Sequence, residues 1–148
     1  MIFLKRYWRI IFPIFFIIVI WCFSATSGDA SNAESLKVAS IFGLPNAVMR
    51  KLAHMALFGA LGYSVASYIK GLHTAIFPNA RIFISCVIPV VVYGAIDEVH
   101  QLTVAGRNAT INDVIIDSIA GICGVLVYIA IFCFYRRWKL YHIIRKKN

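Results

Sequence analysis

Four long apolar runs, separated by short polar stretches, dominate the pattern of this chain. They cover residues 10–25, 52–69, 82–96 and 111–135. A helix needs about 20 mainly apolar residues to cross the hydrocarbon core of a bilayer. The pattern therefore predicts an all-α membrane protein, in which one domain (residues 1–148) forms a bundle of four transmembrane helices.

The first run fits two interpretations. Basic residues precede it and a stretch of small residues, Ser24 to Gly28, follows it, which is also the pattern of a cleaved secretory signal peptide. We favour a retained anchor, because the later runs already commit the chain to the membrane.

The basic residues divide unevenly between the two sides of the predicted bundle. If the N-terminus is cytoplasmic, only Lys37, Arg50, Lys51 and Arg107 fall outside, which leaves eleven of the 15 Lys and Arg residues inside. Cytoplasmic loops carry an excess of Lys and Arg. We therefore expect both termini to be cytoplasmic (N-in/C-in).

Composition narrows the class of protein further. The chain is 61% hydrophobic and 14% charged, whereas soluble domains carry about 25% charged residues, so a water-soluble enzyme is excluded. A net charge of +9 is typical of proteins that bind nucleic acid or a membrane surface. Here the basic residues flank apolar runs, so we expect membrane lipids as partners and no nucleic acid. The tail, residues 136–148, mixes basic with aromatic and aliphatic residues, which predicts an interfacial anchor.

Polar and ionisable side chains gather at the predicted outer ends of the last three spans. On one helix, residues three or four apart share a face, which places Asp97 with His100 and Gln101. By the same spacing, Asp113 and Asp117 share a face. Charges at bilayer depth are costly and usually functional. The candidate site therefore comprises Lys51, His54, Asp97, Glu98, His100, Gln101, Arg107, Asp113 and Asp117.

Three roles for this cluster remain open. It could tie the helices together without any ligand. It could bind an anionic headgroup through Lys51 and Arg107, with the carboxylates and Gln101 holding sugar or peptide groups. No cofactor is predicted beyond a divalent metal, for which the candidate ligands are His54, His100, Asp97 and Asp113.

Three motifs, in order, resemble those of the VanZ-like membrane proteins. The first is Lys51-x-x-His54-x-x-x-Phe58-x-x-Leu61-Gly62, and the second is Tyr93-Gly94-x-x-Asp97-Glu98-x-His100-Gln101. The third is Gly106-Arg107 followed by Asp113, Gly121 and Gly124, so that the resemblance covers about residues 50–127. The chain departs from the family at Arg50, where relatives often have an acid, and at Asp117, where they often have asparagine.

The resemblance implies a small multi-pass protein of the bacterial cytoplasmic (inner) membrane. The member that gives the family its name is associated with low-level resistance to the glycopeptide teicoplanin. We therefore expect an outward-facing polar pocket that binds a lipid-linked cell-wall precursor, a lipid headgroup or a glycopeptide. The alternatives are an intramembrane, metal-assisted enzyme acting on a lipid-linked substrate, and a structural subunit of a membrane complex. The sequence predicts no oligomeric state.

Overall fold

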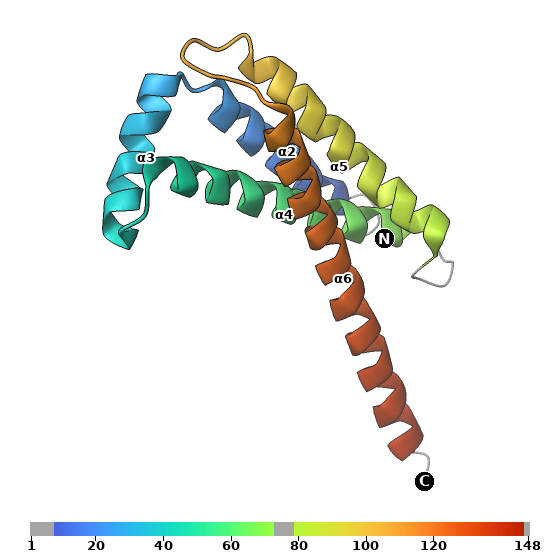
Figure 1. The fold of residues 1–148 in the computed structure, drawn as a ribbon. Helices are drawn as coiled ribbons and strands as arrows, with labels where there is room; N and C mark the ends of the chain where they lie inside the picture. Colours follow the sequence, from blue (N-terminus) through green and yellow to red (C-terminus); the bar gives the residue numbers. More distant parts are fainter. Residues whose placement is uncertain (1–7, 73–78, 147–148) are drawn as a thin grey trace.

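All the regular secondary structure is helical in the residues that the computed structural model describes, 8–72 and 79–146. A short 3-10 helix, η1 (Trp8–Ile10), leads into α2 (Ile11–Ala25). The helices α3 (Gly28–Phe42), α4 (Asn46–Leu72), α5 (Ala80–Gln101) and α6 (Ile111–Arg145) follow in order (Figure 1). The predicted all-α membrane bundle is therefore confirmed.

The helices differ in their capacity to cross a membrane. Each of α4, α5 and α6 is long and apolar enough to do so. By contrast, α2 has 15 residues and a length of about 22 Å, less than the hydrocarbon core of about 30 Å. Together α2 and α3 have sufficient length, but they meet at a bend of 104°. The described residues thus hold three single-helix spans, and a fourth span only if this bent pair is counted as one.

The hydrophobic pattern did not predict α3. Its first turn is capped by Ser27, whose hydroxyl accepts a hydrogen bond from the amide of Ala30, and it ends at Gly43 with φ +64°. Leu36, Ile41 and Phe42 are exposed along it. In Figure 1, α3 connects the end of α2 to the start of α4 along one edge of the molecule.

The basic tail continues the last span. Helix α6 continues without a break from the span to Arg145, so residues 136–145 do not form a separate segment. No glycine or proline follows Gly124 in this helix, and therefore nothing in the sequence ends it early. Its 35 residues extend about 52 Å, and its last turns project beyond the other helices (Figure 1).

The bundle is held together where α4 crosses α6. A Cβ atom at Gly62 would overlap the backbone carbonyl of Gly121, and one at Gly124 would overlap that of Gly59. Helices in membranes associate through small residues that let backbones approach closely. These four glycines therefore fix the crossing point, and the buried core surrounds it with Phe58, Leu61, Cys86, Val90 and Val125.

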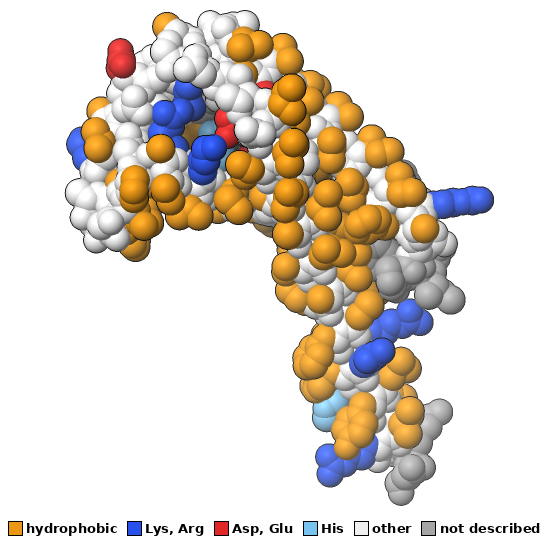
Figure 2. Space-filling model, in the orientation of Figure 1, with side chains coloured by type: hydrophobic (Ala, Val, Ile, Leu, Met, Phe, Trp, Pro, Cys, Tyr) orange, Lys and Arg blue, Asp and Glu red, His pale blue; other side chains and the backbone are white. Residues whose placement is uncertain are grey.

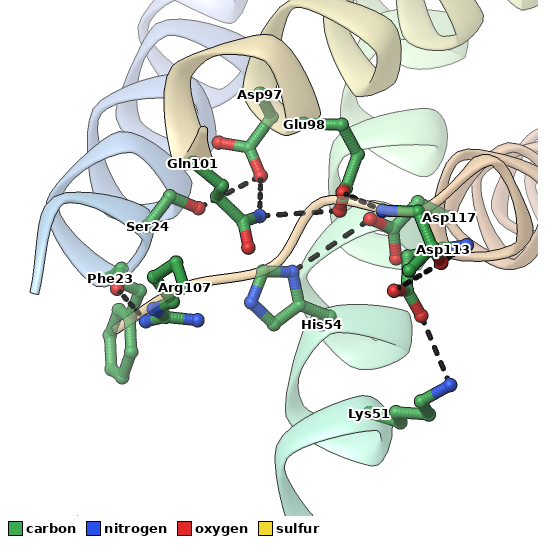
Figure 3. Close-up of polar contacts among 11 residues, drawn as sticks. Phe23, Ser24, Lys51, His54, Asp97, Glu98, Gln101, Arg107, Asp113 and Asp117 are labelled. Carbon is green, nitrogen blue, oxygen red and sulfur yellow. Dashed lines mark hydrogen bonds and ion pairs between the residues drawn. The ribbon is translucent and has the colours of Figure 1, made fainter. Parts of the chain in front are cut away.

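The helix order places one end of every span on the same side of the bundle. The last turns of α2 and α5 meet the first turns of α4 and α6 there, and this end carries the polar residues (Figures 1 and 3).

We predict that this polar end faces outward. Reporters fused within the connection between α4 and α5, and after α6, should read cytoplasmic, because Arg81, Arg136, Arg137 and Lys139 stay inside. Lys5, Arg6 and Lys147, which count toward the same asymmetry, lie outside the described residues. An extracytoplasmic reading after α6 would reverse the orientation and place the polar end in the cytoplasm.

Candidate functional site

The end of α5 carries a buried carboxylate network. Ser24 on α2 donates a hydrogen bond to Oδ2 of Asp97 at 2.8 Å, and Gln101 donates to the same oxygen at 3.0 Å. The Gln101 amide also donates to Oε1 of Glu98 at 3.3 Å. Asp97 is fully buried, so these donors replace the water that Oδ2 has lost, whereas Oδ1 is buried without a hydrogen-bond partner among the described residues. The network joins α2 to α5 (Figure 3).

The first turn of α6 is tied to both α5 and α4. The Thr110 amide donates to Oε2 of Glu98 at 3.2 Å. The Thr110 hydroxyl caps the helix by accepting from the amide of Asp113 at 3.2 Å. Lys51 on α4 pairs with Asp113 at 3.0 Å, but the Lys51 side chain is 55% exposed. Such an ion pair contributes at most about 1 kcal/mol, so the buried contacts of Glu98 hold this junction more firmly.

A histidine and two aspartates lie close together beneath this layer. Nδ1 of His54 is 3.8 Å from Oδ2 of Asp117, and one ligand atom from each of His54, Asp97 and Asp117 lies within 4.8 Å of the others. Atoms that bind one zinc ion lie at most about 4.4 Å apart, twice a typical metal–ligand distance. A small shift would therefore let these three share an ion, whereas the expected ligands His100 and Asp113 lie outside the group.

Arg107 reaches back to the end of α2. Its Nε donates to the carbonyl of Thr26 at 3.1 Å and its Nη2 to the carbonyl of Phe23 at 2.8 Å. Nη2 also contacts the hydroxyl of Ser31 on α3 at 3.2 Å. The last carbonyls of a helix have no partner within the helix. Arg107 supplies that partner, and Nη1 makes no hydrogen bond within the described part of the chain.

The loop that carries Arg107 packs directly on the start of α3. The amide of Gly28 donates to the carbonyl of Ala105 at 3.0 Å, and a Cβ at Gly28 would overlap the carbonyl of Gly106. Gly106 has φ +73°, a conformation that glycine adopts without strain. Glycines at both positions therefore allow the contact that brings Arg107 to α2.

A second arginine, Arg50 on α4, approaches from the other side. Its Nη1 donates to Oδ1 of Asn32 on α3 at 3.0 Å. Burial, and then the charge of Arg50, lower the pKa of the Arg107 guanidinium, although arginine stays protonated in proteins. Neither arginine forms an ion pair among the described residues.

Two cavities open at this end of the bundle. The larger, of about 420 Å³, lies among α4, α5, α6 and the loop before α6. The smaller, of about 250 Å³, lies among α2, α3 and α4 and shares Arg50, His54 and Arg107 with the first. Figure 2 shows Lys and Arg side chains beside a histidine and carboxylates in this hollow.

Most of the residues predicted from the sequence line the larger cavity. The exceptions are His100 and the fully buried Asp97, which do not line it. The predicted residues that do are Lys51, His54, Glu98, Gln101, Arg107, Asp113 and Asp117.

His100 is separated from the cluster by the helix geometry. At 100° per residue, Gln101 lies about 40° from Asp97 and His100 about 60° away on the other side. That side meets α2, where the ring of His100 stacks on Trp21 with centroids 3.8 Å apart. Its Nε2 is buried without a hydrogen-bond partner in the described residues.

Sequence reasoning missed three contributors to the site. Arg50 was considered as a loop charge and as a departure from the family, but not as part of the site, and Ser24 only as part of a small-residue stretch. Asn32 lies on a helix that was not expected. One feature of the sequence could have identified Ser24. It is a polar residue at the end of an apolar run, a position that favours a polar side chain only if a buried partner such as Asp97 is present.

A family model described as VanZ/LLP1 matches residues 9–134. The chain belongs to the VanZ/LLP1 family. The match includes α2 and α3 as well as the three longer spans, so every residue of the polar site of this VanZ-like protein lies within the family domain. No curated protein and no solved structure gave a match.

We predict that Arg107→Lys lowers stability. Lysine retains the charge but loses the planar fork that reaches both the Phe23 and Thr26 carbonyls. Each hydrogen bond to a charged group is worth about 1.5–3 kcal/mol, so the free energy of unfolding should fall by about 2 kcal/mol. Thermal unfolding in mild detergent measures this, with Arg137→Lys on the exposed part of α6 as the control. An unchanged melting temperature would mean that the α2 contacts are dispensable.

Proposed function

We propose that this VanZ-like protein binds the polar head of an envelope amphiphile in the larger cavity, which faces outward from the cytoplasmic membrane of a bacterium. The ligands that fit are a lipid-linked cell-wall precursor, a lipid headgroup or a glycopeptide antibiotic. The supporting observation is that cations and carboxylates line one cavity at the polar end of the spans: Arg50, Lys51 and Arg107, with Glu98, Asp113 and Asp117.

This arrangement suits a head that is both anionic and rich in hydroxyl or amide groups. Guanidinium and ammonium groups bind phosphate or carboxylate. Carboxylate oxygens such as those of Glu98 and Asp117 accept hydrogen bonds from hydroxyl and amide donors. The proposal extends to a contribution to teicoplanin resistance. A protein that binds either the precursor or the antibiotic reduces the binding of teicoplanin to the precursor.

Binding to the purified protein tests the proposal. The probes are an undecaprenyl-linked disaccharide-pentapeptide precursor, phosphatidylglycerol and teicoplanin, each measured by native mass spectrometry in mild detergent. Lys51→Gln should weaken the bound ligand about tenfold, because a charge-assisted hydrogen bond at the cavity wall is lost. Its fold should persist, since its ion pair is mostly exposed.

Lys139→Gln, an exposed change on α6, removes the same charge far from the cavity and should bind like the wild type. Teicoplanin susceptibility of cells expressing each variant gives the matching phenotype. Failure of all three probes to bind the wild-type protein would reject the proposal.

A second function is favoured by one observation, the proximity of His54, Asp97 and Asp117. Imidazole with two carboxylates is a ligand set for zinc, manganese or iron. In this alternative, the protein is an intramembrane, metal-assisted enzyme that acts on a lipid-linked substrate.

Metal analysis of the purified protein tests this alternative. We expect one bound equivalent of zinc or manganese in the wild type and its loss in His54→Ala. His100→Ala is the matched control, because that histidine stacks on Trp21 outside the group. If the wild-type protein binds no metal in titration calorimetry, the metal-assisted enzyme is rejected.

A further inference from the structure

Two arginines meet where the cavities join, and neither has a carboxylate partner. Arg50 and Arg107 line both cavities, and no ion pair involves either of them in the described part of the chain. This contrasts with Lys51, which is paired with Asp113 at 3.0 Å.

The hydrogen bonds of the two arginines leave each with unused donors. Arg50 donates from Nη1 to the neutral amide oxygen of Asn32, and Arg107 donates to backbone carbonyls and a hydroxyl. These contacts orient the guanidinium groups but provide no carboxylate in direct contact, and Asp97 and Glu98 act on the charge of Arg107 only from a distance. Arg107 is only 9% exposed. Two neighbouring like charges in a partly buried position are costly, and an anion between them would remove that cost.

The smaller cavity has a different chemistry from the larger one. Its wall includes Phe23 from α2 and Met49 and Ala53 from α4, with no carboxylate. Ala53 lies one turn farther into the α4 span than Arg50. Phe23 is 52% exposed, so the cavity reaches the outer, lipid-facing surface of the bundle. We therefore expect a ligand group beside Phe23, Met49 and Ala53 to be apolar, although the hydroxyl-bearing residues Thr26, Ser31 and Ser35 line the same cavity.

We propose that Arg50 and Arg107 bind the phosphate of a phosphorylated lipid whose first chain carbons occupy the smaller cavity. A phosphate offers several acceptor oxygens, which match the planar forks of two guanidinium groups. The head beyond the phosphate then enters the larger cavity, past His54. This inference rests on the proposed function and names its ligand class: a lipid phosphate ester, not a water-soluble glycopeptide.

Three related probes separate the parts of this ligand. Dioctanoyl phosphatidylglycerol carries both phosphate and chains, dioctanoylglycerol has the chains alone, and glycerophosphoglycerol has the phosphate alone. Native mass spectrometry in mild detergent should show at least tenfold tighter binding of the complete lipid than of either fragment. Equal binding of dioctanoylglycerol would overturn phosphate recognition, and equal binding of glycerophosphoglycerol would overturn the chain site.

Two variants test the two halves of the site. Arg50→Gln should weaken dioctanoyl phosphatidylglycerol at least tenfold, and Arg50→Lys, which keeps the charge and guards against misfolding, should give an intermediate loss. Ala53→Leu fills the smaller cavity and should weaken the complete lipid at least fivefold while leaving glycerophosphoglycerol unaffected. Lys139→Gln is the control for charge. Wild-type affinity in both Arg50→Gln and Ala53→Leu would overturn the inference.

The outcomes also separate this inference from the broader proposal. If the cell-wall precursor binds in a manner that depends on Lys51 but not on Arg50 or Ala53, the larger cavity binds a head and the two-part site is wrong. If teicoplanin binds and no phosphorylated lipid does, the lipid assignment fails while the proposed polar pocket stands.

Discussion

The polar end of this protein depends on keeping one carboxylate, that of Asp97, away from water. A carboxylate in a low-dielectric interior is tolerated only if other groups replace its hydration. Ser24 and Gln101 do so for one of its two oxygens, Oδ2, from two helices, and Gln101 also contacts Glu98. Glu98 in turn accepts a hydrogen bond from the amide of Thr110, the residue just before α6. The hydrogen bonds that begin at this one buried carboxylate therefore hold the ends of α2, α5 and α6 in place relative to one another.

The carbonyl groups at the end of α2 also need hydrogen-bond donors, and this need accounts for the position of Arg107. This helix is short and its last carbonyls lie within the protein, so they require donors. Arg107 provides them from the loop before α6. Because Ser24 and Ile20 are fully buried against the other helices, α2 is part of the bundle and its removal would expose both core and site. This favours retention of the first apolar run as an anchor.

The three apolar runs that form α4, α5 and α6 were predictable because period and length alone define a span. The Thr110 cap was predictable for a similar reason, since a hydroxyl three residues before Asp113 acts locally. The existence of α3 was not, because its start packs on the distant loop at Gly106. His100 illustrates the limit of helical spacing: it shares a broad face with Asp97, but the position of α2 decides which neighbour each side chain meets.

The glycine crossing of α4 and α6 makes α6 a lever with unequal arms. From the crossing at Gly121 and Gly124, the helix extends about 16 Å to its polar first turn and about 32 Å to Arg145, at 1.5 Å per residue. The helix is continuous throughout, so it tilts as one body. A sideways movement of 1 Å at the polar end would therefore displace the basic end by about 2 Å in the opposite direction. A movement at the polar end would thus be doubled in amplitude at the basic tip of the helix.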